Sequence, residues 1–73
     1  MVYNLLMGSQ QLGKNIKKAR IKAELTQEEV AEKAGVHVSY YSRIERGVVN
    51  PSHEILDNIR KALKMNPSDL FPA

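Results

Sequence analysis

Three polar residues, Ser39, Ser42 and Arg43, are spaced so that they would share one side of a helix that begins near Val38. A guanidinium such as that of Arg43 can donate two hydrogen bonds to O6 and N7 of guanine, and a serine hydroxyl can donate or accept. Val38 offers no hydrogen bond, so it either packs on the methyl group of a thymine or faces the protein. Arg43 has two alternatives, a surface salt bridge or a phosphate contact. We take these four residues as the candidates for contacts with base edges.

The same chain offers little for catalysis or metal binding. Its two histidines, His37 and His53, lie at separate expected helix boundaries, without the carboxylate or thiol spacing of a metal site. The sequence has no cysteine, no glycine-rich phosphate loop and no nucleophile placed beside a base. We therefore expect no enzymatic activity, no catalytic residue, no metal, no cofactor and no small-molecule ligand.

The elements that would position the base-contacting residues are two short helices joined by a tight turn. Thr26 can cap the first helix through its hydroxyl, and Glu29, three positions later, completes the pattern of a capping box. Gly35 suits the turn because a left-handed backbone costs glycine little. The apolar faces are given by Val30, Ala31 and Ala34 in the first helix and by Val36, Tyr41 and Ile44 in the second. This layout predicts a DNA-binding helix-turn-helix, whose second helix enters the major groove.

Three further helices complete the predicted fold. A break is expected at Gly8-Ser9, before the first of them. The expected helices span residues 11–23, 27–34, about 38–46, 52 to about 63, and a short segment from Pro67. We predict an all-α fold of five helices, with an N-terminal extension at residues 1–10 and one domain at residues 11–73.

Length and charge are compatible with this prediction. The chain has 73 residues, a net charge of +3 and an isoelectric point of about 9.4. A single domain of this size has a thin core, because it buries only ~60% of the surface of its extended chain. The modest positive charge permits contact with nucleic acid without requiring it. No apolar run approaches the ~20 residues that span a bilayer, and no signal peptide is present, so we expect a cytoplasmic protein without membrane contact.

In order and spacing, these motifs resemble the phage-repressor/Cro-type helix-turn-helix family, also called the Xre family. The resemblance runs from about residue 12 to residue 71. It rests on the segments Thr26–Val36, Ser39-Tyr40, Ser42–Gly47, Asn50-Pro51-Ser52 and Asn66–Phe71. The resemblance implies a lambda-repressor-like bundle of five helices. It also implies a sequence-specific regulator of transcription, a repressor that binds double-stranded operator DNA as a homodimer.

Family members read bases at the positions of Val38, Ser39, Ser42 and Arg43, and contact the DNA backbone at the position of Gln27. The amide of Gln27 would lie at a helix N-terminus, where free N–H groups suit a phosphate. From their positions, other candidates for backbone contacts are Tyr40, Asn50, Lys14 and Lys17, although the two lysines would equally suit a solvated surface.

An ion pair between Arg20 and Glu45 is also implied by the resemblance. It would link the first helix to the end of the third and orient the recognition helix rather than touch DNA. If the pair is buried, removing one partner costs ~3–5 kcal/mol, whereas an exposed pair is worth under ~1 kcal/mol. The sequence leaves both possibilities open.

Three residues depart from the family's pattern. Glu24 stands where glycine is common, so the end of the first helix is expected to be strained or differently capped. His37 replaces a serine or threonine cap, which leaves the start of the third helix open. Tyr41 replaces an aliphatic residue and is expected to pack in the core.

The main alternative function is a protein-interaction module, such as an antitoxin or adaptor, built on the same bundle. Such a module should carry a contiguous apolar patch on the outer side of the third helix, where a DNA reader exposes polar side chains. Two dimer interfaces are conceivable. One uses Met65, Leu70 and Phe71, expected to be exposed, and the other uses Val2, Tyr3, Leu5 and Leu6.

Overall fold

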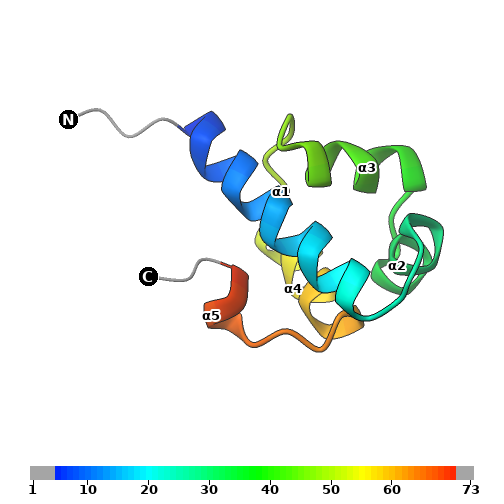
Figure 1. The fold of residues 1–73 in the computed structure, drawn as a ribbon. Coiled ribbons are helices and arrows are strands. Elements are labelled where there is room, and N and C mark those ends of the chain that lie inside the picture. Colours follow the sequence, from blue (N-terminus) through cyan, green and yellow to red (C-terminus); the bar gives the residue numbers. More distant parts are fainter. Residues whose placement is uncertain (1–4, 71–73) are drawn as a thin grey trace.

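The computed structural model describes residues 5–70, and this range contains five helices and no strand. In chain order these are α1 (Leu5–Lys22), α2 (Gln27–Ala34), α3 (Val38–Arg46), α4 (His53–Ala62) and α5 (Pro67–Leu70), as Figure 1 shows. The predicted all-α, five-helix fold is therefore confirmed. None of the described helices is long and apolar enough to cross a membrane.

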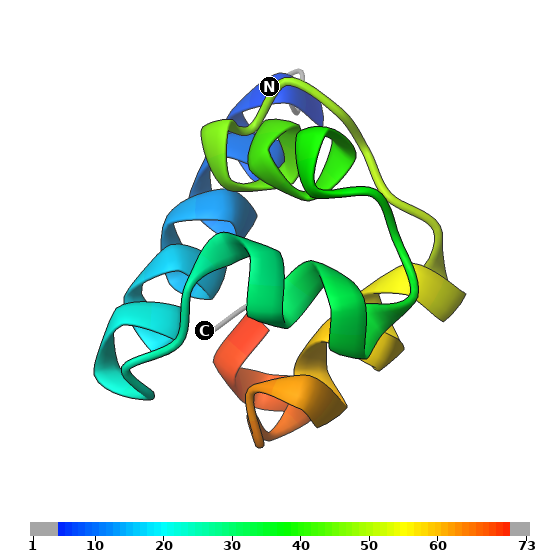
Figure 2. The same ribbon diagram turned by 90° about the vertical axis from the view of Figure 1, so that its right-hand side faces the viewer.

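The helices are arranged so that α3 lies on one side of the bundle and α5 on the opposite side (Figures 1 and 2). The long α1 packs against both of them, while α2 packs against α3 and α4. As Figure 2 shows, α2 and α3 cross at an angle with a short turn between them. This arrangement leaves the outer side of α3 uncovered by other helices.

The core lies where α1, α2, α3 and α4 meet. Its most deeply buried members are Tyr41, Ile16, Ile44, Ile59 and Val30. Leu25 is half-buried and packs against this core just after α1 ends, as expected. Tyr41 is fully buried, which confirms its predicted place on the core side of α3.

Side-chain hydrogen bonds fix the ends of the supporting helices. Ser52 caps α4 by accepting a hydrogen bond from the Ile55 N–H at 3.3 Å. Asn58 in α4 donates from Nδ2 to the Ala34 carbonyl at 3.3 Å, at the last residue of α2. Asn15 in α1 donates to the Leu70 carbonyl at 2.8 Å and so attaches α5. The bond from Asn58 thus joins the end of α2 to α4, and the bond from Asn15 joins α5 to α1.

The turn after α1 is strained, as its departure from the family pattern suggested. Glu24 has a φ of 60°, in the left-handed region that glycine tolerates best. Its N–H still donates to the Ile21 carbonyl at 3.0 Å, and that of Leu25 donates to the Arg20 carbonyl at 3.2 Å. The helix end is therefore closed in the usual way, at a cost of roughly 1–2 kcal/mol for the side chain at this position.

The predicted start of the first helix is wrong, because α1 begins at Leu5 and runs through Gly8-Ser9 without a break. The reason is a tertiary contact. Gln10 lies so close to the end of α3 that a Cβ added to Gly47 would sit 2.5 Å from the Gln10 Cα atom. Contact with α3 thus supports a part of α1 that local sequence signals assigned to a break.

The predicted exposure of two apolar residues near α5 is also wrong. Met65 and Leu70 are 6% and 7% exposed and belong to the core. The short α5 folds back on α1 and covers them, which leaves little of either side chain for a dimer contact. The other interface candidates, Phe71, Val2, Tyr3 and the side chains of Leu5 and Leu6, lie outside the described residues.

Candidate nucleic-acid interface

The two sides of α3 differ sharply in character. Tyr41 and Ile44 are buried against the core, whereas Ser39, Arg43 and Arg46 are exposed. The helix begins at Val38 and ends at Arg46, as predicted. Polar side chains are thus presented to solvent along α3. Figure 1 shows that none of the other described helices covers the outer side of α3. Arg46 was not among the candidates, although its position one turn after Ser42 places it on the same helix surface.

Three residues occupy the boundary between the two sides of α3. Ser42 is half-buried, and Val38 and Tyr40 are half-buried and pack against the core. Of the two roles considered for Val38, the structure therefore favours the protein-facing one. Tyr40 was expected on the outer side of α3, but part of its ring is used for packing. Only a fraction of these three side chains is available to a ligand.

His37 caps α3 in place of the serine or threonine that the family prefers. Its Nδ1 atom accepts a hydrogen bond from the Ser39 N–H at 3.3 Å and lies 2.9 Å from the Ser39 Oγ atom. These two contacts tie Ser39 to the cap. A hydroxyl combines one donor with two acceptor lone pairs, so Ser39 keeps hydrogen-bonding capacity toward solvent.

The turn between the two helices has the predicted geometry. Thr26 Oγ1 accepts from the Glu29 N–H at 3.1 Å, and the Thr26 N–H donates to Glu29 Oε1 at 2.9 Å. These hydrogen bonds with Thr26 lower the pKa of Glu29. Gly35 has a φ of 74° and donates its N–H to carbonyls at the end of α2. The capping box thus fixes the start of α2, and the glycine turn ends α2 before α3 begins.

The ion pair between Arg20 and Glu45 is confirmed, and it is buried. Arg20 Nε donates to Glu45 Oε2 at 2.6 Å, and Nη2 donates to Oε1 at 3.2 Å. The side chain of Glu45 is 2% exposed and that of Arg20 is 14% exposed. Arg20 also donates from Nη1 to the Leu25 carbonyl at 3.0 Å. This two-bond geometry fixes the last turn of α3 to α1 and to the strained turn that follows α1.

The role of Gln27 in this cluster was not predicted. Its Nε2 atom donates to Glu45 Oε1 at 3.0 Å, so the first residue of α2 is held by the last turn of α3. Gln27 is half-buried rather than a plain surface residue. No local signal in the sequence marks this contact, because it joins residues 18 positions apart.

Glu45 is ionised in these surroundings. Burial opposes the charge, but hydrogen bonds from Arg20 and Gln27, the nearby Tyr41 hydroxyl and the charge of Arg20 outweigh it and lower the pKa of Glu45. Burial and the adjacent carboxylate raise the pKa of Tyr41. The Tyr41 hydroxyl is buried and has no partner of good hydrogen-bond geometry among the described residues. It lies beside the carboxylate without completing a bond to it.

The lowered pKa of Glu45 predicts a loss of stability in acid. A carboxylate whose pKa is lower in the folded chain stabilises the fold above its ordinary pKa of 4.5, and this contribution disappears as the pH falls through the lowered value. We expect the urea midpoint of unfolding to fall more steeply below about pH 4.5 in the native protein than in the variant Arg20→Met/Glu45→Met. Glu29 and Asp57, whose pKa values are also lowered, are present in both proteins and cancel. Equal slopes would contradict the prediction.

Two further segments beside α3 carry residues that were predicted to contact the DNA backbone. Lys14 and Lys17 are exposed on α1, and Asn50 is exposed in the loop after α3. Helices α1 and α3 touch at Gly13 of α1, where an added Cβ would lie 2.4 Å from the Ile44 carbonyl oxygen of α3. This close approach brings the part of α1 that carries the lysines against the C-terminal half of α3. The two predicted backbone-contacting lysines therefore lie on a helix that packs against α3.

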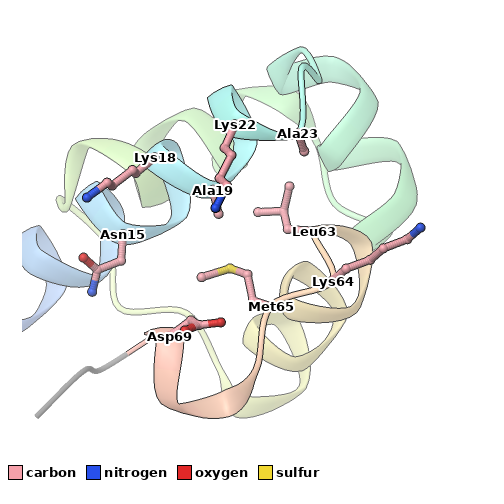
Figure 3. A pocket seen from close by; sticks show the side chains of 9 residues that line it. All are labelled: Asn15, Lys18, Ala19, Lys22, Ala23, Leu63, Lys64, Met65 and Asp69. Carbon is pink, nitrogen blue, oxygen red and sulfur yellow. The ribbon is translucent and has the colours of Figure 1, made fainter.

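A groove of about 510 Å³ lies elsewhere, between α1 and the segment that joins α4 to α5 (Figure 3). Its floor includes Leu63 and Met65, and its rim includes Lys18, Lys22 and Lys64. The side chains of Lys18 and Lys64 point away from each other (Figure 3), so they do not converge on a common ligand position. Within residues 9–70 no group of histidine and carboxylate side chains is arranged to hold a metal. The outer side of α3 is therefore the better candidate site.

Fold and site together define a helix-turn-helix DNA-binding domain, with α2 as the supporting helix and α3 as the recognition helix. Comparison with known families agrees, because the family described as Helix-turn-helix matches residues 16–70. The chain belongs to this helix-turn-helix family.

Similar proteins are regulators. The control protein C.BamHI of Bacillus amyloliquefaciens is 37% identical over 60 residues, which cover 81% of this chain and 74% of that protein. An uncharacterised HTH-type transcriptional regulator of Mycobacterium tuberculosis is 36% identical over 59 residues. The matched region covers 81% of this chain but only 42% of that regulator, so the chain spans less than half of its length.

Solved structures show the same arrangement. The restriction-modification controller protein C.AhdI from Aeromonas hydrophila superposes with a TM-score of 0.83 at 30% identity, covering 86% of this chain and 96% of that chain. The clp gene regulator ClgR from Corynebacterium glutamicum superposes with a TM-score of 0.84 at 30% identity, covering 86% and 67% of the two chains. This chain is therefore similar to the controller protein C.AhdI along nearly the whole length of that protein.

Proposed function

We propose that this protein is a sequence-specific transcriptional regulator, acting as a repressor in the cytoplasm, that binds double-stranded DNA as a homodimer. In this proposal α3 enters the major groove, and its exposed polar side contacts base edges. The observation that carries the proposal is that Ser39 and Arg43 are exposed on a recognition helix whose position is fixed at both ends. His37 caps its start, and the buried pair of Arg20 and Glu45 anchors its last turn. The regulators and controller proteins similar to this chain support the same function.

The surroundings of each side chain suggest its role on DNA. Arg43 is exposed, and the ion pairs within residues 9–70 involve other cations, so its guanidinium is free for a guanine. The hydroxyl of Ser39 can donate or accept, so this residue suits several base edges and is less selective than Arg43. Ser42 and Val38 lie at the edge of the contact surface and contribute smaller contacts. Gln27, Asn50 and the lysines of α1 are assigned to phosphates, with Tyr40 adding its hydroxyl.

A homodimer follows from the size of the recognition surface. One recognition helix covers only a few base pairs, so a selective site requires two copies on two related half-sites. We therefore expect a two-fold symmetric operator whose half-sites lie about one helical turn apart.

Duplex DNA binding itself is tested by fluorescence anisotropy with a labelled random-sequence duplex. Neutralisation of several phosphates should make the affinity fall steeply as salt is raised, by roughly a thousandfold between 50 and 200 mM if about six phosphates are contacted. Affinity independent of salt would contradict the proposal. It would favour the alternative of a protein-interaction module. The structure gives that alternative little support, because the large apolar side chains most exposed among the described residues, Ile21 and Val48, both lie outside α3.

Replacement of Arg43 separates base reading from general affinity. On an operator selected from random duplexes, Arg43→Ala should relax the preference at one base pair and cost ~1–3 kcal/mol of discrimination there. Gln27→Ala should instead weaken binding to all sequences by a similar factor, since phosphates carry no sequence information. The measurement is repeated selection with each variant, followed by anisotropy on single-base variants of the operator. An unchanged base preference for Arg43→Ala would assign Arg43 to a phosphate.

A further inference from the structure

The amide of Gln27 is held in a fixed direction by a group that does not face solvent. Glu45 Oε1 accepts from Gln27 Nε2 at 3.0 Å and from Arg20 Nη2 at 3.2 Å, while Oε2 accepts from Arg20 Nε at 2.6 Å. Because the side chain of Glu45 is only 2% exposed, close packing holds its carboxylate in one rotamer. A side chain at the start of α2 is thus positioned by the last turn of the recognition helix.

One hydrogen of the Gln27 amide remains available after this bond is made. The amide group has two N–H donors, and the contact with Glu45 uses one of them. Gln27 is half-buried, so part of this residue remains exposed at the first turn of α2. In the same turn the Thr26 hydroxyl takes the Glu29 N–H, and the backbone N–H groups of Gln27 and Glu28 have no partner among the described residues. The remaining amide hydrogen of Gln27 and the two backbone N–H groups therefore all belong to the N-terminal turn of α2.

The charge balance at this point permits an anion to approach. A carboxylate one hydrogen bond away from a phosphate would repel it if the carboxylate were unpaired. Here the guanidinium of Arg20 contacts both oxygens of Glu45, so the cluster has no net charge. Glu45 can therefore hold the amide without excluding a phosphate from its other side.

We infer that Glu45 is a positioning residue for DNA binding. It aims the free N–H of Gln27 at a phosphate and joins this contact to the seating of α3. This inference rests on the proposed function. It adds that the phosphate contact of Gln27 depends on Glu45, so that the two residues are energetically coupled in binding.

A double-mutant cycle on a selected duplex measures the coupling. Gln27→Ala is made in the native protein and in Glu45→Asp, which keeps the charge but is one methylene shorter. The long stem of Arg20 can follow the shorter carboxylate, whereas the amide of Gln27 loses its acceptor. Gln27→Ala should raise the dissociation constant about tenfold in the native background, as for a hydrogen bond to a charged group, and less than about twofold in Glu45→Asp. Asn50→Ala, in the loop after α3, is the matched control and should have the same effect in both backgrounds.

The possible failures are distinguishable. If the native protein does not bind duplex DNA, the proposed function fails. If the native protein binds duplex DNA, but Gln27→Ala raises the dissociation constant by the same factor in the native protein and in Glu45→Asp, only the positioning role of Glu45 is overturned. A measurement on the free native protein applies even if Glu45→Asp folds poorly. In NMR spectra the Nε2 hydrogen of Gln27 that is bonded to the carboxylate should lie downfield of its position in a solvent-exposed glutamine amide, and a chemical shift equal to that of an exposed amide would also overturn the inference.

Discussion

Arg20→Met should lower the free energy of unfolding by ~3–5 kcal/mol, a large part of the ~5–15 kcal/mol typical of a small domain. The substitution keeps the apolar stem of the side chain but leaves the carboxylate of Glu45 buried without its cation. Glu45 is 2% exposed, so water cannot replace the guanidinium without opening the contact between α1 and α3. Urea unfolding followed by circular dichroism measures the loss, which requires no DNA.

Two control variants test whether burial is the cause of this effect. Lys61→Met breaks the pair between Lys61 and Asp57, whose side chains are 66% and 47% exposed, and should cost less than ~1 kcal/mol. The double variant Arg20→Met/Glu45→Met removes both charges and should recover much of the loss. A cost for Arg20→Met as small as that for Lys61→Met would show that the pair behaves as a surface contact.

Gly47→Ala should have the second largest effect, because two separate costs add at one position. Gly47 ends α3 with a φ of 76°, where a Cβ costs roughly 1–2 kcal/mol in backbone strain. That Cβ would also lie 2.5 Å from the Gln10 Cα atom, so α1 would have to move, at a further cost of ~1–3 kcal/mol. We expect a total loss of about 2–5 kcal/mol in the free energy of unfolding, again measured with urea.

Gly35→Ala is the matched comparison for this prediction. Gly35 has nearly the same φ, 74°, but an added Cβ there meets no atom within 4 Å. Its loss should therefore contain only the strain of roughly 1–2 kcal/mol, and the difference between the two variants measures the contact between α1 and the end of α3. Equal losses in the free energy of unfolding for the two variants would mean that α1 moves away from the added Cβ at Gln10 without a measurable cost.

Local signals were enough to predict the helix-turn-helix itself. The capping box of Thr26 and Glu29, the left-handed Gly35 and the apolar spacing of α2 and α3 each depend on residues only a few positions apart. The bounds of the first of these helices, 27–34, were accordingly predicted to the residue, and α3 agrees with the approximate range 38–46. The ion pair of Arg20 and Glu45 was predicted by family resemblance, and only the structure shows that it is buried.

The errors concern features that depend on distant parts of the chain. Gly8-Ser9 suggested a break, but contact with the end of α3 supports that part of α1. Met65 and Leu70 were expected at the surface because nothing in their own segment shows that α5 folds back on α1. The bond from Gln27 to Glu45 was missed for the same reason, since a separation of 18 residues leaves no periodic signal.

The anchor of α3 and its exposed side occupy different residues of the same helix. Glu45 is held from within by Arg20 and Gln27, whereas Ser39 and Arg43 point into solvent. Under the proposed function, substitutions at the two exposed positions should change the preferred target sequence, while the buried anchor at Glu45 stays intact. The chain is for this reason a suitable starting point for evolving or designing altered specificity.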